Sequence, residues 1–200
     1  MRQTSLKIAA LAIVSVTASI ASARAESLII RNCTWCHGSS AQGYTPAPRL
    51  AGQHVAYTES QLLSFRTHVR DNPFSKQYMW GAAANLSPQT VHALATYFAA
   101  LPAEAANDGD RELRAIGRTI YQQGLPDANI AACAACHGPR GEGVATIPRL
   151  GGLAYTYLKR RLQQWGEGYH AAARPPMPRI ARKLSGAQIE ALASYLSFVK

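Results

Sequence analysis

Two short motifs contain the residue types with which this chain could perform chemistry. The sequence CTWCH occupies residues 33–37, and the sequence CAACH occupies residues 133–137, one hundred positions further along. The pattern C-x-x-C-H is typical of covalent c-type haem attachment, in which both thiols form thioethers with the haem vinyl groups and the histidine binds the iron. The motifs therefore predict two haem c groups, held by Cys33, Cys36, His37, Cys133, Cys136 and His137.

Paired cysteines also have other uses, because a single C-x-x-C occurs in redox-active dithiols and as half of a zinc site. The chain has four cysteines, and all four belong to the two motifs. No cysteine is left for a disulfide or a separate catalytic thiol. The histidine directly after each pair favours haem attachment over a dithiol or a zinc site.

One methionine in each half is the candidate for the second axial ligand of the iron. Met79 lies 42 residues after His37, Met177 lies 40 residues after His137, and each precedes a Leu-Ser pair by seven residues. Both lie near prolines, so we expect loops there. A lone methionine often fills a gap in a core, but two in register favour iron ligation. A His/Met iron has a raised potential and no open coordination position.

Four other histidines could compete for the iron. None of them has a histidine at the equivalent position of the other half, so we expect surface or hydrogen-bonded side chains instead. These residues are His54, His68, His92 and His170.

A Pro-Arg-Leu sequence follows each haem motif. The carbonyl group of Pro48 or Pro148 could accept a hydrogen bond from the ring N–H of the haem histidine, which would fix its tautomer and strengthen its bond to iron. A plain turn proline is the alternative. The neighbouring Arg49 and Arg149 are candidates for bidentate pairing with haem propionates.

The haem motifs belong to a longer internal repeat. The identities continue through the Pro-Arg-Leu loops at an offset of 100 and into the last stretch of each half at an offset of 98. Such a repeat predicts two copies of one folding unit. The predicted division of the chain is a signal peptide at 1–25, an N-terminal domain at 26–102, an acidic linker at 103–115 and a C-terminal domain at 116–200.

Both domains are predicted to be helical. Ser87 followed by a proline, and Ser185 with Gln188 three residues later, are typical helix starts, and Asp110 could cap a helix in the second half. We find no alternating strand pattern. The apolar stripes with helical spacing are Val55, Leu62, Phe65 and Val69; Val91, Leu94, Phe98 and Leu101; Leu113, Ile116 and Ile120; Tyr157, Leu158, Leu162 and Trp165; and Ile189, Leu192, Leu196 and Val199.

The N-terminal segment resembles a secretory signal peptide. Arg2 and Lys7 precede an apolar run that is too short to span a bilayer, which needs about 20 residues. Cleavage after Ala25 follows an A-x-A pattern, with cleavage after Ala23 and an uncleaved anchor as alternatives. Because bacteria attach haem c outside the cytoplasm, export to the periplasm agrees with the haem motifs.

The chain is basic, with a formal net charge of +10, and loss of the signal peptide leaves +7. The surplus lies in the C-terminal domain, notably at residues 159–161 and at Arg179, Arg182 and Lys183. Such a surface could steer an acidic protein partner or bind anionic lipid headgroups, and a solvated basic face is the simpler alternative. Nucleic acid is a poor partner for an exported protein.

These features together resemble the class I cytochromes c, doubled in tandem as in the di-haem cytochrome c4 family. The resemblance covers nearly the whole mature chain and includes the segments 52–66 and 70–73 before Met79. It implies an all-α fold of two tandem domains, each wrapped around one covalent haem, and a periplasmic role in carrying electrons towards a terminal oxidase or another respiratory partner. Tyr78 and Trp80 depart from the small residues expected beside the methionine.

The predicted function is electron transfer by Fe(II)/Fe(III) cycling, without catalysis at the iron. Two alternatives remain. The chain could be an electron-transfer subunit of a dehydrogenase or reductase complex, or a di-haem peroxidase. The peroxidase would need an open iron position, and the paired methionines argue against one.

Overall fold

The computed structural model describes residues 28–170 and 176–200. The predicted signal peptide at 1–25 lies outside these residues. Within them the chain is helical, and the extended pairs are limited to isolated bridges such as Tyr44 with Ala47. The same residues include no helix that is long and apolar enough to cross a membrane. The all-α prediction is therefore confirmed.

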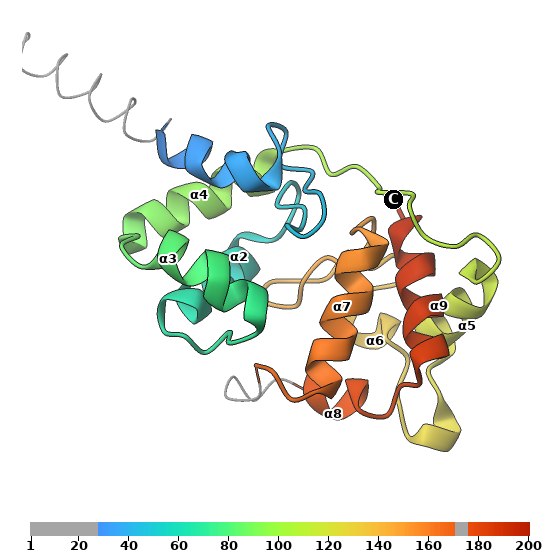
Figure 1. Ribbon diagram of the computed structural model, residues 1–200. Coiled ribbons are helices and arrows are strands. Elements are labelled where there is room, and N and C mark those ends of the chain that lie inside the picture. The colour runs from blue at the N-terminus through green and yellow to red at the C-terminus, as the bar shows by residue number, and fades with distance from the viewer. Residues whose placement is uncertain (1–27, 171–175) are drawn as a thin grey trace, which may run out of the picture.

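The first domain places its helices around the first haem motif (Figure 1). Residues 28–37 form a helix that ends at His37, so the motif lies on its last turns. The elements that follow are α2 (Val55–Arg66), the π-helical turn η1 (Ser75–Met79), α3 (Trp80–Ala83) and α4 (Pro88–Ala100).

The second domain lies beside the first (Figure 1), and its haem-motif helix is preceded by a further helix that the described part of the first domain lacks. Its last helix packs along its first, and the haem motif forms a short helix near them. The elements are α5 (Arg114–Gln123), the 3-10 turn η2 (Pro126–Ala128), α6 (Ala134–His137), α7 (Tyr155–Gly166), α8 (Met177–Ala181) and α9 (Gly186–Ser197).

Capping residues set the starts of two helices as predicted. The hydroxyl group of Ser87 accepts the N–H of Thr90, and a proline occupies the first helical position of α4. At α9, Ser185 and Gln188 form a reciprocal capping box. Each cap satisfies N–H groups that the first helical turn leaves without partners.

Three helix predictions need correction. Val69 lies beyond the end of α2, and Ile116 is exposed on α5 instead of sharing the core face of Ile120. Asp110 accepts the N–H of Glu112 and does not cap α5, which starts at Arg114. Apolar spacing and a potential capping residue alone do not show where a helix starts or ends, or which of its faces packs against the core.

The linker is held against the second domain. The N–H of Ala106 donates to the carbonyl of Gly152 over 3.1 Å, and the N–H of Asn107 donates to that of Ser197 over 3.0 Å. The N–H of Gly109 donates to the Ser197 hydroxyl over 3.0 Å. These bonds connect the segment between the domains to the end of α9 and to the loop before α7.

The two domains share a hydrogen-bonded interface. The amide of Gln53 both donates to the backbone carbonyl of Arg149 and accepts its N–H, over 3.1 and 2.9 Å. The ring of His54 donates to the carbonyl of Glu142 over 2.7 Å. The loops after the haem motifs therefore meet side chains from the opposite domain.

Helices α5 and α9 cross at a glycine. A methyl group on Gly117 would collide with the backbone of Ala191 and with the side chain of Tyr195. The absence of a side chain therefore lets the two helices approach closely, and Ile120, Tyr121, Leu192 and Leu196 pack into the core beside the crossing.

We predict that Gly117→Ala lowers the free energy of unfolding by about 2–3 kcal/mol, the cost of overpacking a core. Chemical denaturation of the holoprotein measures this change. The control is Gly186→Ala in α9, where an added methyl meets nothing within 4 Å. Equal stability of the two variants would show that the crossing is loosely packed.

Candidate haem sites

The two haem histidines are held in the same way. His37 and His137 are buried, and their Nδ1–H groups donate to the carbonyl oxygens of Pro48 and Pro148 over 2.7 and 3.1 Å. A carbonyl can only accept, so Nδ1 carries the proton and Nε2 keeps the lone pair that binds iron. The predicted hydrogen bond from each haem histidine to a proline carbonyl is thus confirmed in both domains.

A glycine in each loop brings the proline carbonyl to the histidine. Gly43 and Gly143 adopt φ angles of +77° and +69°, and their N–H groups donate to the carbonyls of His37 and His137, both over 2.8 Å. A side chain on Gly43 would lie 2.5 Å from the backbone of Pro48. Glycine is required because it tolerates a positive φ and this close approach.

Burial makes both histidines poor bases and good neutral ligands. Burial is the main reason that the pKa values of His37 and His137 are lowered, although the bond to the proline carbonyl opposes it. At His37 the positive charge of Arg70 lowers the pKa further. A neutral imidazole is the form that binds iron.

The four cysteines form no disulfide, and they lie one and four residues before these histidines. Cys33 and Cys133 are partly buried and pack against the apolar clusters of their domains, while Cys36 and Cys136 are exposed. In each motif the helix therefore presents one thiol inward and one towards the rim. These positions fit the two thioethers of a haem c group, which adds its own redox-active iron when bound.

Met79 lies in a π-helical turn and not in the predicted loop, and side-chain contacts hold this turn at both ends. It is the last residue of η1, and α3 follows immediately. The turn begins where the side chain of Asn72 donates to the hydroxyl of Ser75 and accepts its N–H, over 2.6 and 3.2 Å. The indole of Trp80 stacks on His68 at 3.8 Å between ring centroids and donates to the carbonyl of Arg70 over 2.9 Å.

Met177 likewise lies in a helix, as the first residue of α8. Pro176 and Pro178 flank it, and a proline near a helix start needs no N–H partner. Both methionines are partly buried. Iron ligation by Met79 and Met177 stays a prediction.

Three of the other histidines are surface or hydrogen-bonded side chains, as predicted. His54 bridges the domains, His92 binds Glu59 at the surface over 2.7 Å, and His68 is exposed beneath Trp80. The prediction for His170 is wrong. Its side chain is only 4% exposed, and neither ring nitrogen has a hydrogen-bond partner among the described residues.

Arg49 does not have a free guanidinium for bidentate propionate binding. It is buried, and its terminal nitrogens donate to the carbonyls of Glu104, Gly151 and Gly152. Its main role is therefore to join the two domains. Arg149 is half-buried, and its Nε has no partner among the described residues.

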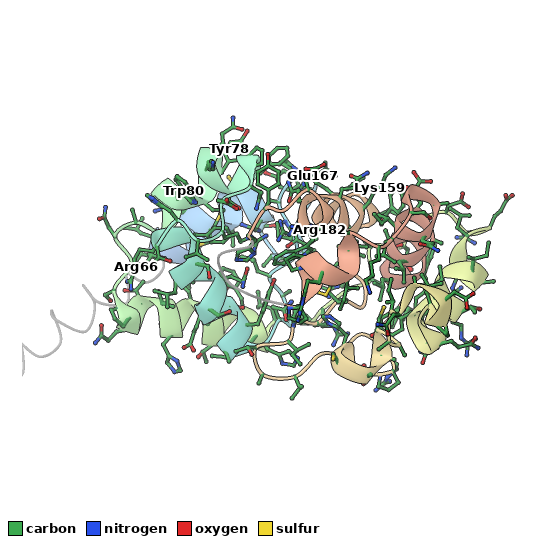
Figure 2. All side chains as sticks on the ribbon, turned by 90° about the horizontal axis from the view of Figure 1, so that it is seen from below. Arg66, Tyr78, Trp80, Lys159, Glu167 and Arg182 are labelled. Carbon is green, nitrogen blue, oxygen red and sulfur yellow. The ribbon has the colours of Figure 1, made fainter. Side chains whose placement is uncertain are left out.

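The basic run at 159–161 does not form one exposed face. Lys159 pairs with Glu190 over 2.6 Å, Arg160 donates to the carbonyl of Pro46 over 2.7 Å, and Arg161 is buried. Figure 2 shows Lys159 on α7, Glu167 just after the end of α7, and Arg182 just after the end of the neighbouring α8. The exposed basic residues of the second domain lie outside this run and include Arg179, Arg182 and Lys183.

Sequence reasoning missed the residues that bring these sites together. The sequence marks Trp80 only as an unusual neighbour of the methionine, and Arg70 only as part of a segment that resembles the family. Gln53 was not identified as an interface residue. Their signal lies in contacts between segments that are distant in the chain, which periodicity does not record.

The structure has two helical domains, and in each a buried histidine that follows a pair of cysteines donates to a backbone carbonyl. This arrangement defines a tandem class I cytochrome c. The family model for cytochrome c matches residues 22–102 and 115–200. Cytochrome c-552 of Acidithiobacillus ferridurans is 34% identical over 92% of this chain and 80% of that protein. The thiosulfate dehydrogenase electron acceptor of Stutzerimonas stutzeri is 36% identical over 84% and 78%.

A solved structure extends the comparison. The cytochrome c4 of Acidithiobacillus ferrooxidans matches with a TM-score of 0.79 and 34% identity, covering 84% of this chain and 99% of that one. The chain belongs to the cytochrome c family, in its di-haem cytochrome c4 branch. It is a di-haem electron carrier and not an enzyme, and its cofactors are two covalent haem c groups.

We predict that Trp80→Leu loosens the turn that carries Met79, because it removes both the stack on His68 and the bond to the Arg70 carbonyl. The long-wavelength absorption band of a thioether–Fe(III) bond should weaken, because the loss of a hydrogen bond worth about 1 kcal/mol lowers the equilibrium constant for ligation about fivefold. The control is Tyr78→Leu, whose side chain is 50% exposed. An unchanged band in Trp80→Leu would show that Trp80 does not position this methionine.

Proposed function

We propose that this protein accepts electrons from a dehydrogenase in the periplasm and delivers them to a terminal oxidase. One observation supports the proposal: the ring of each haem histidine donates to a proline carbonyl, and each domain contributes one partly buried methionine as a candidate for the second iron ligand. Two ligands from the protein close the iron. A closed iron can exchange electrons while excluding oxygen and peroxide as ligands.

The chain's own residues give the carrier its properties. The carbonyls of Pro48 and Pro148 orient the imidazole rings and increase their electron donation. Met79 and Met177 are assigned as the second axial ligands, which favour Fe(II) and raise the potential. The interface through Gln53 and Arg49 holds the two domains together, so electrons can pass between their haems without a change of partner.

Relatives support the direction of transfer. One relative is described as the electron acceptor of thiosulfate dehydrogenase, and another, 29% identical, as a subunit of a cbb3-type cytochrome c oxidase. By analogy, this chain would take electrons from a dehydrogenase and pass them to an oxidase. The N-terminal segment supports export to the periplasm, with cleavage after Ala25 as the proposed maturation step.

The basic residues that remain exposed on the second domain, Arg179 and Arg182 among them, would favour an acidic docking surface on the partner. A permanent subunit of a dehydrogenase complex is the second candidate. It is favoured by the similarity of this chain to one third of a thiosulfate dehydrogenase structure, of which it covers 36% at a TM-score of 0.73.

Oxygen uptake by respiratory membranes tests the proposal. Membranes of the source organism are washed free of cytochromes and supplied with the protein, which a periplasmic dehydrogenase and its substrate keep reduced. We expect substoichiometric holoprotein to restore oxygen uptake, because each molecule is oxidised and reduced repeatedly.

Three outcomes would count against the proposal. Uptake that does not respond to the protein would contradict delivery to an oxidase. Isolation of the protein from its host only at a fixed ratio to a dehydrogenase would support the subunit alternative. Consumption of peroxide by the reduced protein alone would point to a peroxidase.

A further inference from the structure

Two consecutive residues of the first domain hold the loop that follows the haem motif of the second. The side chain of Gln53 is buried and meets the backbone of Arg149 at two points: its oxygen accepts the N–H over 2.9 Å, and its nitrogen donates to the carbonyl over 3.1 Å. The ring of His54 donates to the carbonyl of Glu142 over 2.7 Å. The first domain therefore contacts this loop at two separate places.

The contact with the N–H of Arg149 falls on the peptide group that binds the haem histidine. The carbonyl of this peptide group is that of Pro148, which accepts the ring N–H of His137 over 3.1 Å. A peptide group whose N–H donates becomes a better acceptor at its carbonyl, because hydrogen bonds in a chain polarise one another. Gln53 therefore acts on the bond that orients the imidazole of His137 and increases its electron donation.

The contact of His54 reaches the same haem histidine through its backbone. The carbonyl of Glu142 belongs to the peptide group whose N–H is that of Gly143, and this N–H donates to the carbonyl of His137 over 2.8 Å. One peptide group thus joins His54 to the backbone of His137, and another joins Gln53 to its ring.

The second domain has no residues that could make the same two contacts. At the repeat offset of 100, Leu153 matches Gln53. Ala154 likewise matches His54. Neither Leu153 nor Ala154 has a hydrogen-bonding atom in its side chain, so neither could hold the loop around His37 in this way.

Other contacts from the second domain do reach the loop of the first, but they end on different groups. Arg160 donates to the carbonyl of Pro46 over 2.7 Å, and the hydroxyl groups of Thr156 and Thr45 share a hydrogen bond of 3.1 Å. Neither contact falls on a peptide group that binds His37. The connection is therefore one-sided, from the first domain to the haem histidine of the second.

We propose that Gln53 is a positioning residue for the second haem: through the peptide group that both contact, it strengthens the hydrogen bond of His137 and lowers the potential of that haem alone. This inference rests on the proposed binding of iron by His137. The ring bond of His137 is longer than that of His37, 3.1 against 2.7 Å, so it depends more on a contact that fixes its acceptor. A more electron-rich imidazole favours Fe(III), which lowers the potential.

Replacement of Gln53 by the residue that the second domain has at this position tests the proposal in the holoprotein. Spectroelectrochemical titration measures both midpoint potentials, and NMR signals of the axial ligands assign each potential to a domain. In Gln53→Leu the potential of the second haem should rise, and that of the first should stay unchanged. At a fixed applied potential the Fe(II)/Fe(III) ratio of the second haem should rise about threefold, which is about 28 mV for a one-electron couple.

The ring proton of the haem histidine gives a readout of the hydrogen bond itself. In the reduced, diamagnetic holoprotein, the Nδ1–H signal of His137 should move upfield in Gln53→Leu, because a weaker hydrogen bond deshields the proton less. The signal of His37 should not move. Gln53→Met, which keeps the length of the side chain without its hydrogen bonds, should give the same shift, and His54→Ala should give a smaller one because it acts on the backbone.

The matched control is Thr156→Val, which removes a hydrogen bond between the domains that does not reach a haem histidine. Potentials and ring signals that move no more in Gln53→Leu than in Thr156→Val, at full haem content, would overturn the proposal. Equal shifts at both haems would overturn the claim that Gln53 acts on the second haem alone. A signal of His137 that is missing from the iron ligands of the unmodified protein would instead overturn the proposed ligation, whatever the variants do.

Discussion

The fold depends on a covalent haem at the centre of each small domain. In the described part of the first domain, the buried apolar cluster is small and consists of Ala41, Ala51, Leu94 and Phe98, with Phe65, Ala83 and Ala95 buried outside it. A domain of fewer than about 80 residues rarely gains enough stability from such a core alone. A large flat cofactor, tied to the helix that carries the cysteines, adds the apolar mass around which the other helices pack.

The same constraint determines the chemistry. The haem histidine ends a helix, and the loop that follows turns at a glycine and returns a proline carbonyl to the ring. The loop therefore sets the tautomer that would bind iron. In the proposed arrangement, the methionine of each domain would bind the iron from the opposite side and leave it no open coordination position.

The sequence predicts the local features well, because they depend on residues that are close in the chain. The haem motifs, the caps at Ser87 and Ser185 and the carbonyls of Pro48 and Pro148 are all short-range patterns. The assignment of iron ligands remains a prediction, because it depends on the cofactor.

Errors arise where the two domains meet or where a helix stops. Arg49, Arg161 and His170 are buried. The sequence predicts a propionate contact for Arg49, an exposed basic run around Arg161, and a surface or hydrogen-bonded side chain for His170. Charged and polar side chains are mostly exposed in single domains, so only the docking of one repeat on the other could reveal their burial. Ile116 shows the opposite error, because an apolar residue at helical spacing need not face the core.

The most direct test of the closed-iron account is a carbon monoxide difference spectrum of the reduced holoprotein. Met177→Ala serves as the positive control, since removal of the proposed ligand should let one haem bind carbon monoxide. The account predicts no binding at either haem of the unmodified protein. Binding at one haem of the unmodified protein would contradict the account, because that iron would then have an open or labile position.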